Sequence, residues 1–218
     1  MNDKAGRDTP RRGEATRQRV LAAAREEFAD LGLAGARMQR IADRARVNKA
    51  MLHYYFGGKE ELYECVLVET LSQLLAGMVK LVTDESLPVE ARLRRFLEAY
   101  LAFLSQHPEL PRLIILETLT GGDRVPRLFV EAQRQVDALR AEQLLQLLRE
   151  GIEAGVLRRV DPRQTVVSAI SLVAFYFVAS PVIQAALHLG EEERRRFLAE
   201  RGQHVVDLFL HGVLAPRS

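Results

Sequence analysis

Cysteine is almost absent from this chain of 218 residues, in which Cys65 stands alone. A single thiol excludes a disulfide framework within one chain and a metal site built from several cysteines. We expect Cys65 to pack as a small apolar residue, and a redox-sensing thiol is the alternative. The amino terminus lacks the apolar stretch of a secretory signal peptide, so we expect a cytoplasmic protein.

The spacings of common catalytic and metal-binding motifs are also lacking. The five histidines form no H-E-x-x-H motif and no other set that would hold a metal ion. No order of Ser, His and Asp stands out from chance, and the paired glycines indicate turns rather than phosphate-binding loops. We therefore expect no enzymatic activity, no metal and no cofactor.

No segment shows the alternation of apolar and polar residues that is typical of a β-strand. Apolar residues recur at helical spacing instead, which predicts an all-α fold of about nine helices. Asp161 and Pro162 are typical of a helix start, as a cap followed by a first-turn proline. After three amino-terminal helices, we expect helices over residues 59–83, 89–105, 111–119, 126–153 and 191–211, and a further helix that starts at Pro162 and contains the stretch 164–190.

Residues 37–59 are the most informative part of the chain, because two short helices and a tight joint fit into them. The first helix has one apolar stripe, formed by Met38, Ile41, Ala42 and Ala45. Asn48 is suited to cap the second helix, in which only Leu52 and Phe56 are expected to face inward. The other side chains are rich in hydrogen-bond donors and aromatic rings. This composition is typical of a helix that enters a DNA major groove, and a short solvated surface helix is the alternative.

This segment resembles the DNA-binding domain of TetR-type transcriptional regulators, whose pattern contains I-A, then V-S-K-x-T-L-Y-Y-H-F, then K-E-x-L. Here residues 41–42 are Ile-Ala, residues 47–56 read VNKAMLHYYF and residues 59–62 read KEEL. The resemblance covers about residues 16–66. It implies a homodimeric repressor that binds double-stranded operator DNA and is released by a small-molecule effector. The implied domains are a flexible basic arm (1–13), a helix-turn-helix domain (14–58) and a ligand-binding and dimerisation domain (59–218).

The same resemblance implies which residues contact DNA. The full set is Arg37, Gln39, Asn48, Lys49, Ala50, Met51, His53, Tyr54, Tyr55 and Lys59. We expect base contacts from Lys49, Met51 and His53. We expect phosphate contacts from Arg37, Tyr54, Tyr55 and Lys59. The family often has Thr at position 37 and Gly at position 46, so Arg37 loses a helix cap, and Arg46 is strained if its φ is positive.

Charge is distributed in the way that DNA binding requires. Residues 1–59 carry 13 Lys and Arg against 7 Asp and Glu, whereas residues 60–218 carry 18 against 22. A basic lobe on an otherwise acidic body is the electrostatic footprint of a nucleic-acid-binding protein.

Two carboxy-terminal segments indicate how subunits associate. The stretch Gln164–Gly190 contains no Asp, Glu, Lys or Arg, so by length it is a candidate membrane span. Its polar residues and interior Pro181 favour a helix that is buried on all sides. The last helix has an apolar stripe, which we expect at the dimer interface as part of a four-helix bundle. The stripe residues are Leu198, Gly202, Val205 and Phe209.

An effector pocket is expected among the aromatic and aliphatic residues of the carboxy-terminal domain. The candidates are Tyr100, Phe103, Leu104, Leu116, Glu117, Phe129, Phe175, Tyr176 and Phe177. Ordinary core packing is the alternative for each of them. Glu117 lies among apolar neighbours and is suited to meet a cationic or hydroxylated ligand. The alternatives for the whole chain are a membrane-tethered DNA-binding protein and a helical interaction module that does not bind DNA.

Overall fold

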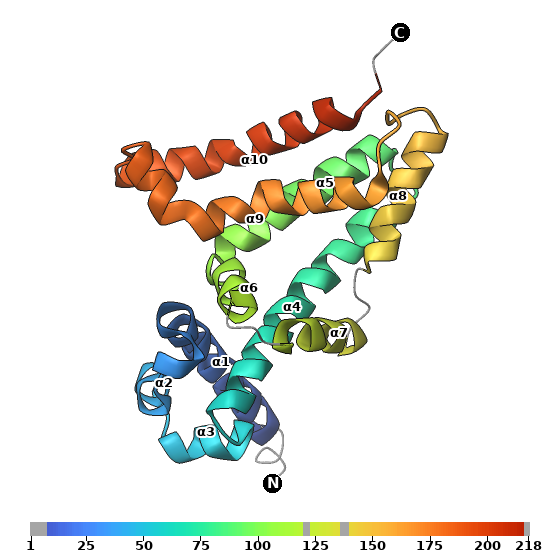
Figure 1. Cartoon of the computed structure of the whole chain (residues 1–218). Helices are drawn as coiled ribbons and strands as arrows, with labels where there is room; N and C mark the ends of the chain where they lie inside the picture. Colours follow the sequence, from blue (N-terminus) through green and yellow to red (C-terminus); the bar gives the residue numbers. More distant parts are fainter. Residues whose placement is uncertain (1–7, 120–122, 136–139, 216–218) are drawn as a thin grey trace. The chain divides into compact units, whose positions relative to one another are not determined.

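The computed structural model describes residues 8–119, 123–135 and 140–215, with side chains from residue 13 onward. Within these ranges there are ten helices and no β-strand, which confirms the predicted all-α fold (Figure 1). The helices are α1 (Asp8–Gly35), α2 (Met38–Ala45), α3 (Lys49–Phe56), α4 (Lys59–Thr83), α5 (Val89–Gln106), α6 (Glu109–Leu119), α7 (Arg124–Gln135), α8 (Ala141–Glu153), α9 (Pro162–Ala186) and α10 (Glu191–Val213).

The chain divides into two compact units. Unit 1 contains residues 1–70 and 113–128, and unit 2 contains residues 71–112 and 129–218. This division differs from the boundary at residue 58 that the sequence suggested, because part of α4 and a later segment of the chain pack with the first three helices.

Unit 1 is built around α1, which packs on α2 and on the start of α4. Phe28 of α1 is fully buried and meets the ring of Tyr63 edge-on, with 4.8 Å between ring centroids. The regular part of α1 ends at Gly32, whose φ of 65° interrupts the helix at the stop that the sequence predicted. α1 begins at Asp8, so residues 8–13 are helical where the sequence placed a flexible arm. Residues 1–7 lie outside the described residues.

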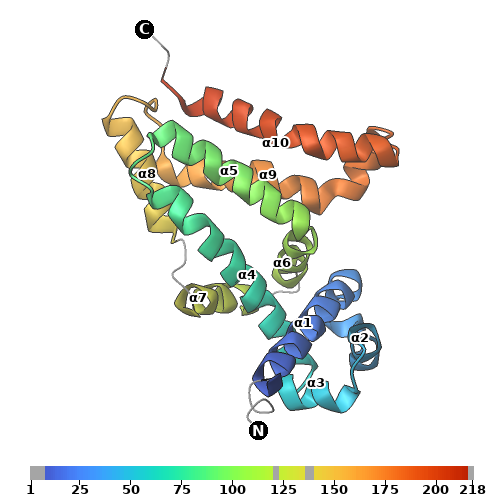
Figure 2. The same ribbon diagram turned by 180° about the vertical axis from the view of Figure 1, so that it is seen from behind.

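Unit 2 has its core between α5, α8, α9 and α10. Helices α5, α9 and α10 lie side by side in both views (Figures 1 and 2). Asp161 caps α9 as predicted, because its Oδ1 accepts hydrogen bonds from the backbone N–H groups of Arg163 and Gln164 at 2.8 and 3.2 Å. The core side chains include Leu93, Phe96, Leu97, Leu144, Leu148, Val173, Phe177, Val205 and Phe209.

The single helix predicted over residues 126–153 is wrong, since α7 ends at Gln135 and α8 begins at Ala141. The buried positions explain the break. If one helix continued from Ala132 to Leu144, their apolar faces would point about 120° apart, because each residue advances a helix by about 100°. The backbone N–H of Arg140 donates to Gln143 Oε1 at 2.8 Å and closes the start of the new helix.

Candidate nucleic-acid interface

The joint between α2 and α3 is set by the backbone at Arg46. Arg46 lies in the left-handed region, with φ 55° and ψ 49°, so the condition for the strain expected from the sequence is met. The N–H of Val47 donates to Ala42 O at 3.0 Å, and the N–H of Arg46 donates to Asp43 O at 3.1 Å. This pair of bonds is a Schellman motif, which closes α2 and turns the chain toward α3. The predicted apolar stripe of α2 is buried, from Met38 to Ala45.

Helix α3 buries two side chains, leaves Tyr55 half-buried and exposes the others. Leu52 is 0% exposed and Phe56 is 6% exposed, which confirms that these two residues face inward. Asn48 caps the helix as predicted, and its Oδ1 accepts from the backbone N–H of Ala50 at 2.9 Å. The outward residues of the predicted DNA-contact set are Lys49, Ala50, Met51, His53 and Tyr54.

The two tyrosines of α3 have different surroundings. Tyr54 is 83% exposed, the highest value among the exposed large apolar side chains. Tyr55 is half-buried, and its hydroxyl lies 3.5 Å from the position that a Cβ on Gly13 would occupy. Tyr54 is therefore open to a partner, whereas Tyr55 lies against α1.

Three other predicted contact residues have different surroundings within unit 1. Lys59 Nζ donates to Ala34 O at 3.3 Å and to Ala36 O at 3.2 Å, so it holds the end of α1. Gln39 Nε2 donates to Asp43 Oδ1 at 2.8 Å. Arg37 makes no side-chain cap bond, as its sequence implied, and its side chain is exposed.

The start of α2 is held by a buried carboxylate that the sequence did not single out. Glu27 of α1 is 0% exposed, and its Oε1 accepts from the backbone N–H of Arg37 at 3.4 Å. Its Oε2 lies 3.3 Å from Arg40 Nε. Glu27 therefore ties α2 to α1, and Arg40 balances its charge.

Two parts of the chain match known families. Residues 20–66 match the tetR family of bacterial regulatory proteins, and residues 88–209 match the tetracyclin repressor-like carboxy-terminal domain. The chain belongs to the tetR family. It is a DNA-binding transcriptional regulator, and neither alternative from the sequence receives support from these matches.

Full-length relatives agree with this membership. The chain is 32% identical over 198 residues to the helix-turn-helix transcriptional repressor SCO4008 of Streptomyces coelicolor, covering 89% of this chain and 96% of that protein. It is 29% identical over 188 residues to the regulator RutR of Escherichia coli, covering 85% of this chain and 86% of RutR.

Solved structures share the fold. The regulator SCO4942 of Streptomyces coelicolor has a TM-score of 0.68 at 25% identity, covering 92% of this chain and 99% of that chain. The ketosteroid regulator KstR2 of Mycobacterium tuberculosis has a TM-score of 0.70 at 20% identity, covering 92% and 95%.

One segment of the tetR-like carboxy-terminal domain packs with the DNA-binding helices. Residues 113–128 lie inside the carboxy-terminal match but belong to unit 1. Leu113 and Leu128 are each 2% exposed, and a Cβ on Gly32 would lie 3.0 Å from Leu116 Cδ2. The regulatory half of the sequence therefore supplies part of the unit that carries α3.

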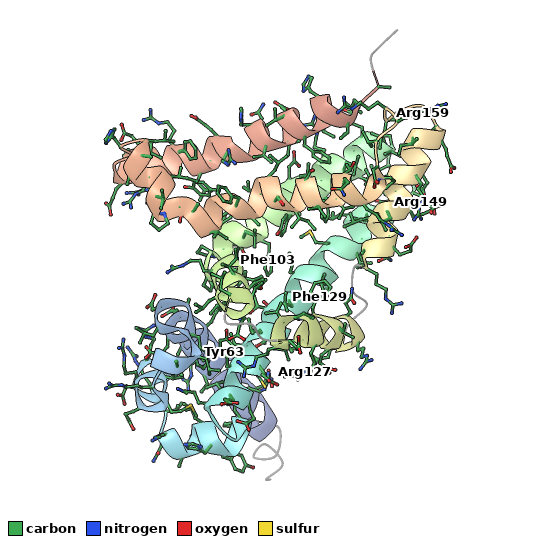
Figure 3. All side chains as sticks on the ribbon, in the orientation of Figure 1. Tyr63, Phe103, Arg127, Phe129, Arg149 and Arg159 are labelled. Atoms are coloured by element: carbon green, nitrogen blue, oxygen red, sulfur yellow. The ribbon has the colours of Figure 1, made fainter. Side chains whose placement is uncertain are left out.

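An ion-pair cluster joins that segment to α4. The Arg124 guanidinium lies 3.3 Å from Glu117 Oε2, 3.5 Å from Glu64 Oε1 and 5.7 Å from the centroid of the Tyr63 ring. Burial, together with the charge of Glu117, raises the pKa of the Tyr63 hydroxyl. Figure 3 labels Tyr63 on α4 and Arg127 on α7, and Arg127 forms a second ion pair with Glu64. The sequence singled out Glu117 from its apolar neighbours but gave no sign of Arg124.

The predicted pocket residues divide between the units. Leu116 and Glu117 lie in unit 1, and the other seven lie in unit 2. Within unit 2, Leu104, Tyr176 and Phe177 are buried, whereas Phe129 and Phe175 are 38% and 64% exposed. Tyr100 and Phe103 are half-buried, and burial raises the pKa of Tyr100 to about 12. Phe103 and Phe129 are labelled in Figure 3.

Unit 2 contains a groove and a small void, and none of the nine predicted pocket residues lines either. An open groove of about 300 Å³ is lined by Val82, Thr83, Glu85, Arg92, Glu142, Gln143, Gln146, Leu147 and Glu150. An apolar void of about 10 Å³, roughly one water in size, is lined by Leu93, Phe96, Leu97, Leu144, Leu148, Thr165, Val166, Ala169 and Phe209.

The predicted stripe of α10 packs inside the protomer. Val205 and Phe209 are 1% and 6% exposed, and a Cβ on Gly202 would lie 3.5 Å from Leu101 of α5. Leu198 is half-buried.

A different apolar face, on α9, is exposed to solvent within the protomer, because Val167, Phe175 and Val182 are 60%, 64% and 71% exposed. Within the protomer the prediction of a helix buried on all sides is wrong for α9, because only 22% of its most apolar stretch is buried, against 56% for α4. By length and composition alone, either helix is long and apolar enough to cross a membrane.

The lone thiol lies in unit 1. Cys65 is half-buried, and burial raises its pKa. A raised pKa leaves less of the reactive thiolate at neutral pH, which favours the packing role over a redox-sensing role.

Proposed function

We propose that this tetR-family regulator is a cytoplasmic, homodimeric repressor that a small molecule releases from its operator. The relative matched over nearly its full length, SCO4008, is named a repressor. NicS of Pseudomonas putida, 32% identical over 142 residues, is also named a repressor. FasR of Mycolicibacterium smegmatis, 36% identical over 115 residues, is named an activator. The match with the greater coverage favours repression.

The outward face of α3 is the observation that carries the proposal. Two anchored side chains fix the helix, and its exposed face offers a cation, an imidazole and a phenol. We propose base contacts from Lys49, Met51 and His53, and phosphate contacts from Arg37 and Tyr54. Tyr55 and Lys59 contact α1 in this structure, so their contribution to DNA binding is expected to be smaller.

The experiment compares DNA affinity among variants over a salt series. The operator is first obtained by selection from random duplexes, and a scrambled duplex is the control. Lys49→Ala should weaken operator binding by about 1–3 kcal/mol in each half-site and leave the scrambled duplex little affected, because it removes a hydrogen bond to a base. Arg37→Ala should weaken both and flatten the salt dependence, because it removes a phosphate contact that releases counterions. If both variants bind as wild type does, α3 does not read DNA.

The exposed face of α9 is the proposed dimer surface. Val167, Phe175 and Val182 recur at helical spacing on the face opposite the buried Val173 and Phe177. An apolar stripe of this kind, left uncovered in one protomer, matches the self-complementary surface that a two-fold dimer needs. Leu208 of α10 is a further exposed apolar side chain, at 55%. Dimerisation also suits a helix-turn-helix reader, since two half-sites double the contacts.

We propose unit 2 as the effector-binding unit, with two candidate sites that differ in chemistry. The aromatic set around Tyr100 and Phe103 suits an apolar or amphipathic molecule, because small-molecule pockets are mostly apolar and aromatic. The groove of about 300 Å³ suits a polar one, because three glutamates and two glutamines line it. An effector should raise the melting temperature by mass action and weaken operator binding by reciprocal coupling. Two variants then distinguish the sites. Loss of the thermal shift in Phe103→Ala would indicate the aromatic set, and loss in Gln146→Ala would indicate the groove.

A further inference from the structure

The imidazole of His53 is held at the end of α3 by an unusual turn. Gly57 has φ 83° and ψ −84°, and the N–H of Gly58 donates to Phe56 O at 3.2 Å. These values describe a γ-turn centred on Gly57, a conformation that is strained for residues other than glycine. The turn places Gly57 O 2.7 Å from His53 Nδ1, while the N–H of Gly57 donates to His53 O at 2.9 Å.

This contact fixes which ring nitrogen of His53 carries the proton. A carbonyl oxygen only accepts hydrogen bonds, so Nδ1 must be the donor. In a neutral imidazole the other nitrogen, Nε2, then has a lone pair and no proton. The side chain is exposed on the outward face of α3, four residues after Lys49. With the His53 imidazole neutral, the helix therefore presents a donor at Lys49 and an acceptor at His53.

We propose that His53 selects operator bases that offer an amine to it, adenine or cytosine, over guanine and thymine. In the major groove adenine N6 and cytosine N4 are donors, whereas guanine O6 and N7 and thymine O4 are acceptors. An unprotonated Nε2 accepts from the first two and repels the lone pairs of the others. Phosphate oxygens are acceptors too, so the same nitrogen is unsuited to a backbone contact.

This inference rests on the DNA-binding function and predicts the base at one operator position. Duplexes are selected from a random pool with the full-length protein, and affinity is then measured for all four bases at every operator position. At one operator position, the base preference of the wild-type protein should be lost in His53→Ala. That position should carry adenine or cytosine in the wild-type operator, bound with about 10-fold higher affinity than guanine or thymine there. His53→Arg should shift that preference to guanine, and His53→Gln should narrow it to adenine, because these side chains make bidentate pairs with those bases.

Nitrogen NMR of the imidazole rings tests the tautomer without DNA, with His53→Ala identifying the signal. A protonated Nδ1 and an unprotonated Nε2 are expected, and the reverse assignment would overturn the inference. A wild-type preference for guanine or thymine at the His53 position would also overturn it, as would an equal loss of affinity on all sequences. In those cases DNA binding itself still stands. A protein that selects no duplex at all would instead overturn the function of α3 and this inference with it.

Discussion

Arg124 and Glu117 form an ion pair of 3.3 Å within the unit that contains α3. Glu117 is 7% exposed, and Glu64 on α4 lies 3.5 Å from the same guanidinium. Arg124 thus separates two carboxylates that would otherwise repel each other, and one of them is buried. The contact joins α6 and α7, from the carboxy-terminal match, to α4, the helix that directly follows α3.

Removal of that cation should destabilise the protein. Arg124→Gln leaves the Glu117 carboxylate buried beside Glu64 without the Arg124 charge, and we expect the free energy of unfolding to fall by about 2 kcal/mol. The value is below that of a fully buried pair because the Arg124 side chain is 25% exposed. Urea unfolding followed by circular dichroism measures the change.

Arg127→Gln is the matched control, since it removes the same charge from the same helix. The Arg127 side chain is 60% exposed, and within the described residues of unit 1 it forms an ion pair with Glu64 alone. Water screens such a pair, so a much smaller change is expected. Equal losses in the two variants would show that net charge, and not the buried pair, is responsible.

Arg46→Gly should stabilise the DNA-binding unit. A left-handed residue other than glycine costs about 1–2 kcal/mol, and glycine loses about 0.4–1 kcal/mol more backbone entropy on folding. The difference predicts a gain of roughly 0.5 kcal/mol, measured as a shift in the urea midpoint. Arg46→Ala keeps the strained φ and removes the charge, so it should not share the gain. If alanine stabilises as much as glycine, charge rather than φ explains the effect.

Two helical glycines should respond to alanine in opposite directions. A Cβ on Gly151 of α8 would lie 2.6 Å from Leu157 Cδ1 and 2.8 Å from Val89 Cγ1, so Gly151→Ala should cost about 1–3 kcal/mol. A Cβ on Gly77 of α4 would meet nothing within 4 Å, and Gly77→Ala should gain up to about 1 kcal/mol from helix propensity. Thermal melts of both variants provide the test. A loss of stability in Gly77→Ala would show that this face of α4 packs against another surface in solution.

The proposed dimer surface on α9 predicts a contrast between α9 and α10. Phe175→Asp adds a charge to the exposed face, so light scattering should show folded monomers with an unchanged helical circular dichroism spectrum. Val205→Asp adds a charge where the side chain is 1% exposed, so it should unfold the protomer itself. If Phe175→Asp remains dimeric at micromolar concentration, the exposed face of α9 is not the interface.

Local signals in the sequence were sufficient for the parts of the fold that depend on neighbouring residues. The stripe of α2, the Asn48 cap and the Asp161 cap need only a few adjacent positions, and the structure confirms all three. The break before α8 was missed because no glycine or proline marks the junction between Gln135 and Ala141. The break is revealed only because the buried positions before and after the junction do not fall on one helical face. Which positions are buried becomes known from the structure.

The candidate site shows the same limit over longer distances. The motif around Lys59 predicts a DNA contact, but the sequence cannot show that its amine meets the carbonyls of Ala34 and Ala36. The stripe containing Val205 correctly indicates a buried face. It does not identify the covering element, which within the protomer is α5. Periodicity therefore locates an apolar surface but does not identify the element that covers it.

The β-bridge between Leu157 and Leu214 joins the loop after α8 to the end of α10. The N–H of Arg158 donates to Val213 O at 2.9 Å, and the N–H of Ala215 donates to Val156 O at 3.0 Å. These two amides come from distant parts of the chain but belong to one bridge, so we expect both to lose protection in a single opening event. In hydrogen–deuterium exchange the two amides should therefore show matched protection factors, which together report how readily this end of unit 2 opens.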